Sequence, residues 1–164
     1  MGLGTNADPI QPLTSVLPGL NERPGGVPIM GMQRTQTTVL ANKTAASTTY
    51  KVPIFVAPCD GWWIKEIKLV EIVKADYATS TLAIENYDKS ASAGVNVLST
   101  TNQDLEAAGI TAKQGFDLTL TTTDSDRFMD EGDMLWATLA LGAAEVAAGE
   151  GIAVSVVMVG PVID

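Results

Sequence analysis

The chain has 164 residues, enough for one domain with an appendage but too few for two well-packed cores. It contains 10 Lys and Arg against 19 Asp and Glu, so its formal net charge is -9, and neither nucleic acid nor an anionic membrane is expected as a partner. The sequence has no histidine, the commonest general base and metal ligand, which argues against most classes of enzyme.

Residues 1–34 differ in composition from the rest of the chain, since they contain five of the 8 prolines and six of the 15 glycines. Proline fixes φ and disfavours helix at the preceding residue. The sequence therefore predicts an extended N-terminal arm at residues 1–34, followed by one domain at residues 35–164. No secretory signal is expected, because residues 1–10 carry no basic side chain and no long apolar run.

The arm is too apolar for a solvated linker, so we expect it to lie on a neighbouring subunit or on a partner protein. Its candidate contacts are six aliphatic residues: Ile10, Leu13, Leu17, Leu20, Val27 and Ile29. The alternative is disorder of roughly the first 20 residues, with the remainder of the arm packed on its own domain.

Residues 35–164 predict a succession of strands, because Val, Ile, Thr and aromatic residues occur in runs separated by Gly, Asp, Asn and Ser. The expected strands cover residues 37–41, 48–56, 62–74, 79–87, 116–121, 134–141 and 151–159. Antiparallel strands at this spacing predict an all-β fold, namely an antiparallel β-sandwich of jelly-roll-like type with an extended N-terminal arm. A closed barrel is the alternative.

Three local irregularities are expected. Pro53 cannot donate to a ladder, so its strand should be an edge strand or carry a bulge. Within residues 62–74, Ile64 and Ile67 fall on opposite faces of an ideal strand, which indicates a bulge or burial on both faces. Residues 102–108 show a weak capping pattern followed by glycine, which predicts one or two helical turns.

The densest polar run is 124–133. Its first aspartates resemble the start of a calcium loop, but Phe128 occupies the next ligand position and no glutamate stands twelfth, so a solvated turn is favoured. In such a turn Gly132 adopts positive φ and Asp133 bonds nearby amides. The single cysteine, Cys59, has no neighbouring base to activate it, and no serine has a histidine partner. We therefore expect no catalytic residue, no cofactor and no metal.

Trp62 and Trp63 are adjacent, so in a strand one of them points inward and the other outward. The outward side chain is a candidate exposed contact for a protein or a sugar. Burial in the core or at a subunit contact is the alternative.

Three segments carry a resemblance to a known family. They are Ala57-Pro58-x-Asp60-Gly61, then Arg127-Phe128-x-x-x-Gly132-Asp133-x-Leu135, and finally Gly151-Ile152-x-Val154-x-Val156. Over residues 48–160 the chain resembles small β-sandwich structural proteins of tailed bacteriophages, in particular the head decoration, or cement, proteins.

The resemblance implies a non-enzymatic virion protein. Such proteins are made in the host cytoplasm, sit on the capsid exterior, often as homotrimers, and bind the major capsid protein. A protein that binds only the assembled shell lowers the free energy of that state and so stabilises it. The alternative function is a receptor-binding or fibre-tip domain that grips a cell-surface glycan through its loops and its exposed tryptophan. A third possible function is that of a bacterial lectin-like carbohydrate-binding module.

Overall fold

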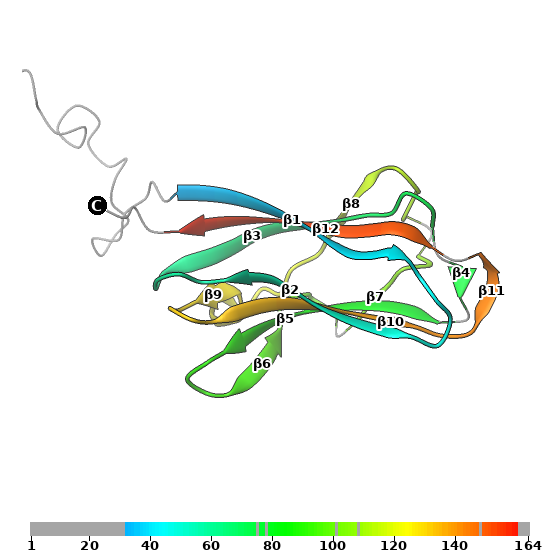
Figure 1. Ribbon diagram of the computed structural model, residues 1–164. Coiled ribbons are helices and arrows are strands. Elements are labelled where there is room, and N and C mark those ends of the chain that lie inside the picture. The colour runs from blue at the N-terminus through cyan, green and yellow to red at the C-terminus, as the bar shows by residue number, and fades with distance from the viewer. Residues whose placement is uncertain are drawn as a thin grey trace, which may run out of the picture. The chain divides into compact units, whose positions relative to one another are not determined.

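The computed structural model describes residues 32–160 except 75, 78, 101, 108 and 148 (Figure 1). Residues Gln33–Gly160 form one compact unit. The six aliphatic residues expected to be arm contacts, Ile10 to Ile29, lie outside the described residues. Among the described residues, no helix is long and apolar enough to cross a membrane. The first strand begins at Met32 and so includes the last three residues of the segment predicted as arm.

Two sheets make up the body. The first contains β1 (Met32–Lys43), β12 (Glu150–Gly160), β3 (Trp62–Val70) and β8 (Gly115–Leu118) in that order, with β9 (Phe128–Met129) beside the start of β3. The second contains β2 (Thr49–Val56), β10 (Met134–Leu141), β5 (Ser80–Asp88) and β6 (Ala93–Asn96), with β7 (Gln103–Asp104) also on β5. A two-stranded ribbon of β4 (Asp76–Tyr77) and β11 (Ala144–Ala147) lies at the opposite end from β9 (Figure 1).

The strand pairing is nested. Strand β1 pairs with β12, β2 with β10, β3 with β8, and β5 with β6, so the first of the eight main strands lies beside the last and the middle two lie beside each other. A long antiparallel hairpin folded over itself into two sheets has this order, which is that of a jelly roll. The predicted all-β, antiparallel, jelly-roll-like sandwich is therefore confirmed, and two separate sheets exclude the closed barrel.

The core lies between the two sheets and follows from alternation along the strands. In β10, Leu135 and Leu139 are buried, while Trp136 and Thr138, which lie between them in the sequence, are half-buried. In β12, every second residue from Ile152 to Met158 is buried in the same way. Because successive side chains of a strand point to opposite faces, each strand places one set of apolar residues in the core. Both strands are central in their sheets, as this pattern requires.

Two of the expected irregularities are present. The pairing of β3 with β12 shifts between Glu66 and Ile64, which leaves Lys65 as a bulge and lets Ile64 and Ile67 both face the core. Strand β2 is an edge strand, and its register against β10 shifts beside Pro53.

The helical turns predicted at residues 102–108 are wrong for the described part of that segment. Residues Gln103 and Asp104 form β7 and pair with β5. The Asp104 carboxylate accepts a hydrogen bond from the amide of Glu106 at 2.8 Å, which makes a local turn. Leu105 is buried, and its amide bonds the Ser80 carbonyl instead of continuing a helix.

Candidate interaction site at one end of the sandwich

The first two segments that carry the family resemblance bond to each other at the end of the sandwich near β9. The Ala57 amide donates to the Asp133 carbonyl at 2.9 Å, and the Gly132 amide donates to the Ala57 carbonyl at 2.9 Å. The Asp60 carboxylate accepts from the amide of Glu131 at 2.7 Å. The turn before β3 and the turn before β10 are thus one hydrogen-bonded unit, although they are about 70 residues apart in sequence.

Asp133 and Gly132 have the roles predicted for them. The Asp133 side chain is only 6% exposed, and its two oxygens accept from the amides of Lys89 at 3.0 Å and Asp130 at 2.9 Å. Gly132 has φ of 87°, in the region that favours glycine. Both Asp133 oxygens therefore hold the backbone of two turns together. Among the described residues, no three acidic or thiol side chains are grouped so that they could hold a metal ion.

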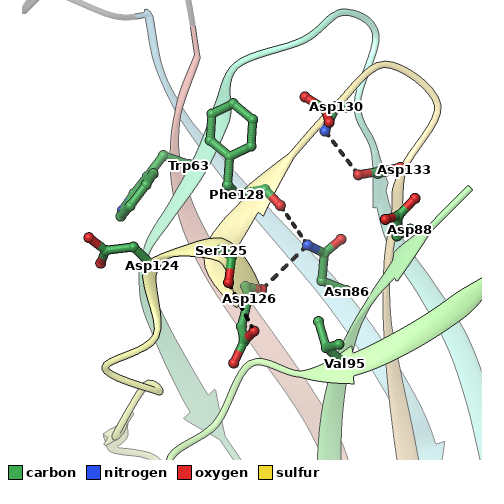
Figure 2. A pocket seen from close by; sticks show the side chains of 10 residues that line it. All are labelled: Trp63, Asn86, Asp88, Val95, Asp124, Ser125, Asp126, Phe128, Asp130 and Asp133. Atoms are coloured by element: carbon green, nitrogen blue, oxygen red, sulfur yellow. Dashed lines mark hydrogen bonds between the residues drawn. The ribbon is translucent and has the colours of Figure 1, made fainter. Parts of the chain in front are cut away.

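Beside these turns lies a groove of about 600 Å³, which we call the end groove (Figure 2). It opens between β5 and β6 of one sheet and β3, β9 and the short 3-10 turn η1 (Asp124–Arg127) of the other. Its lining consists of Trp63, Asn86, Asp88, Val95, Asp124, Ser125, Asp126, Phe128, Asp130 and Asp133. The groove is therefore the mouth between the two layers of the jelly roll.

Asn86 holds the two sides of this mouth together. It is 3% exposed and points inward from β5, where its amide nitrogen donates to the Phe128 carbonyl at 2.7 Å and to the Asp126 carbonyl at 3.4 Å (Figure 2). These bonds tie η1 and β9 to the opposite sheet. Sequence reasoning missed Asn86, although it shares strand parity with the buried Leu82 and Ile84 and is thus a polar residue at a core position.

Asn86→Ala is expected to lower the free energy of unfolding by about 1–3 kcal/mol, because two carbonyls of the η1–β9 segment lose their donor. The matched control is Asn96→Ala, since Asn96 also donates to two carbonyls but lies in a more exposed place. Urea unfolding monitored by circular dichroism measures both. Equal losses for the two variants would contradict the role of Asn86 as a tie between the sheets.

The two tryptophans lie on opposite faces of β3. Trp62 is buried, with its ring packed edge-on against Phe55 at a centroid distance of 5.1 Å, so it is not available as a surface contact. Trp63 lines the end groove, and its ring packs edge-on against that of Phe128 at a centroid distance of 6.3 Å. The Lys65 ammonium and the Arg127 guanidinium lie over the Trp63 ring at 5.0 and 5.1 Å. The Trp63 ring thus already has two cation–π partners. Phe128, which is 39% exposed, is more accessible than Trp63.

Negative charge surrounds the end groove. Asp124 pairs with Arg127 at 2.6 Å, but no other groove carboxylate has a salt-bridge partner among the described residues. Hydrogen bonds from Ser90 and Ala91 lower the pKa of Asp88 below its ordinary value. Burial, and then repulsion from Asp60, Asp133 and Asp88, raise the pKa of Asp130. Asp130 is thus the carboxylate of this end whose charged form is disfavoured, by burial and by three neighbouring carboxylates.

Comparison with known proteins identifies no family for the chain. No protein-family model matches the chain, and no curated protein matches it. Among solved structures, it is similar to a chain of "Structure of infectious bursal disease virus Gx strain", with 13% sequence identity and a TM-score of 0.39. The match covers 79% of this chain and 32% of that chain. A likeness this distant supports no conclusion about function.

Proposed function

We propose that this chain is a structural protein of a virion that binds the outer surface of an assembled phage capsid and stabilises it. The observation that carries the proposal is the nested pairing of the eight main strands, because jelly rolls recur in viral capsid and lectin domains. Fold alone does not assign a function. The resemblance to decoration proteins adds support, since residues 57–61 and 127–135, on which it partly rests, form one bonded unit.

In this proposal the partners are the major capsid protein and further copies of the chain itself, arranged as a homotrimer. Each copy binds the assembled shell and not its free subunits, so binding lowers the free energy of the assembled state by mass action. Interfaces of about 1,600 Å², repeated over a lattice, are sufficient for this. The N-terminal arm supplies apolar contacts, and the acidic body faces solvent or basic patches of the capsid rather than the genome.

A glycan-binding fibre tip is the second candidate. The observation that favours it is the exposed Phe128 ring beside Ser125 and Asp126, since sugars are bound by aromatic rings together with polar side chains. Trp63, the side chain that the sequence suggested for this purpose, is engaged by Lys65 and Arg127. Phe128 is therefore the aromatic ring on which the glycan proposal rests.

The copy number of the chain in purified virus particles distinguishes the two functions. A decoration protein is expected in hundreds of copies per particle, because it occupies a site repeated over the capsid lattice. A fibre tip is expected in far fewer copies, and the isolated protein should bind glycans. Quantitative mass spectrometry against the major capsid protein as internal standard measures the ratio, and absence of the chain from particles would contradict both functions.

A further inference from the structure

The end groove has apolar walls that no part of the described chain covers. Val95, from β6, is 40% exposed and faces the groove from one sheet, and Phe128, from β9, faces it from the other. Val95 lies directly opposite Asn86 in the β5–β6 pair, so both side chains project on the same face, toward the space between the sheets. Large apolar side chains at the mouth of a sandwich favour a ligand that inserts apolar groups.

The rim of the groove carries carboxylates, which favour a positively charged ligand. Asp126 and Asp130 stand on the β9 side and Asp88 on the β5 side, and Figure 2 shows these carboxylates distributed around the apolar walls rather than gathered at one point. Burial, and then repulsion from Asp60, Asp133 and Asp88, raises the pKa of Asp130, and the repulsion is relieved when a cationic group approaches this carboxylate. Spaced carboxylates suit several cations along a chain better than a single metal ion, in keeping with the absence of a metal-binding group among the described residues.

The third feature is a free strand edge. Strand β6 ends the order β2-β10-β5-β6, so one of its edges pairs with no other strand of the described chain. An exposed strand edge offers backbone donors and acceptors to an added strand. A peptide that lies along Ala93–Asn96 in extended form places alternate side chains toward Val95 and the groove.

We propose that the end groove binds an extended basic segment of the capsid protein, with aliphatic or aromatic side chains between Val95 and Phe128 and Lys or Arg side chains against Asp126 and Asp130. The inference rests on the proposed function for the identity of the partner, while the chemistry of the ligand comes from the groove itself. The chain's own N-terminal segment does not meet this requirement, because residues 1–31 carry Asp8, Glu22 and Arg23 and thus no excess of positive charge.

The test uses the full-length protein and three synthetic peptides labelled with a fluorophore, in each of which every second residue is Ser, so that the other residues share one face of the extended chain. The remaining positions alternate Lys with Val in the first peptide (the Lys–Val peptide), Glu with Val in the second, and Lys with Ser in the third. We expect the Lys–Val peptide to bind at least about tenfold more tightly than either of the others, and its affinity to fall as salt is added. Fluorescence anisotropy measures the dissociation constants.

Variants then locate the site. Asp126→Asn combined with Asp130→Asn is expected to weaken binding of the Lys–Val peptide by about three- to tenfold, since two charge pairs are lost, one at a half-buried and one at an exposed carboxylate. Val95→Ser is expected to weaken it by a similar factor. The matched controls are Asp117→Asn and Val39→Ser, which make the same chemical changes at exposed positions of β8 and β1, outside the groove, and should change affinity by less than about twofold.

Equal binding of all three peptides, or equal effects of groove and control variants, would overturn the inference. Binding of full-length protein to purified capsids is measured in parallel. If the protein occupies capsids but the groove variants occupy them as fully as the wild type, the inference fails and the proposed function stands. If the wild-type protein binds the Lys–Val peptide in the groove but no capsid, the groove is a basic-peptide site and the capsid function fails.

Discussion

Replacing Trp62 with alanine is expected to lower the free energy of unfolding by about 3–5 kcal/mol, the usual cost of truncating a buried tryptophan. The side chain is 1% exposed and packs against Phe55 at the start of β3. The last residue of β12, Gly160, lies so close that an added Cβ would come within 2.7 Å of the indole ring. Since glycine has no side chain to move into the vacated space, the cavity left by Trp62→Ala stays largely open.

The matched control for this prediction is the neighbouring residue. Trp63→Ala is expected to cost about 1 kcal/mol, because the ring is partly exposed and its removal chiefly ends its contacts with Phe128, Lys65 and Arg127. Guanidinium unfolding at 25 °C measures both variants, with the slope against denaturant checked for constancy. If Trp63→Ala lowers the free energy of unfolding as much as Trp62→Ala does, then Trp62 is not the residue of this pair that faces the core, and the described orientation of β3 is wrong.

Much of the fold could be predicted because alternation is a local property. Residues 134–141 and 151–159 alternate so regularly that strand, burial and central position all follow from the pattern. The nested pairing could not be read in the same way, since it joins strands more than 100 residues apart, as in β1 with β12. Which tryptophan faces the core was likewise open, because the bulge at Lys65 changes the parity of β3 along its length.

The end groove could be predicted less well than the fold. Its walls come from β3, β5, β6 and the η1–β9 segment, and nothing in the sequence shows that these four pieces meet. The polar run 124–133 was predicted to be a solvated turn, which is confirmed only for its last four residues, where Asp133 bonds the amide of Asp130. The earlier part is different, because residues 124–127 form η1 and residues 128–129 form β9 with Met129 buried. Val95, on the other wall of the groove, carries no local sequence signal. Asn86 is the exception, because a polar residue on the buried face of a strand calls for a partner, which here is the η1–β9 backbone.

Deletion of residues 1–30 is expected to leave the body folded and to weaken capsid binding by about a hundredfold or more. The described core extends from Leu40 to Met158, so the deletion removes none of it, and the thermal midpoint should change little. Burying six aliphatic side chains gains about 1.5–3 kcal/mol each before ordering costs, which are of similar size. A net gain of only about 3 kcal/mol corresponds to a hundredfold in affinity.

Co-sedimentation with capsids that lack the protein measures the effect. Because deletion also shortens the chain, a second variant keeps the full length and substitutes Leu13→Asp and Leu17→Asp, which introduces charge at two predicted contacts. Its matched control is Gln11→Asp with Thr14→Asp, which adds the same charge at polar positions of the same segment. The apolar contact model requires the leucine variant to bind far more weakly than its control. If the deletion variant occupies capsids as fully as the wild type, the sandwich body alone binds the capsid and the arm does not contribute to binding.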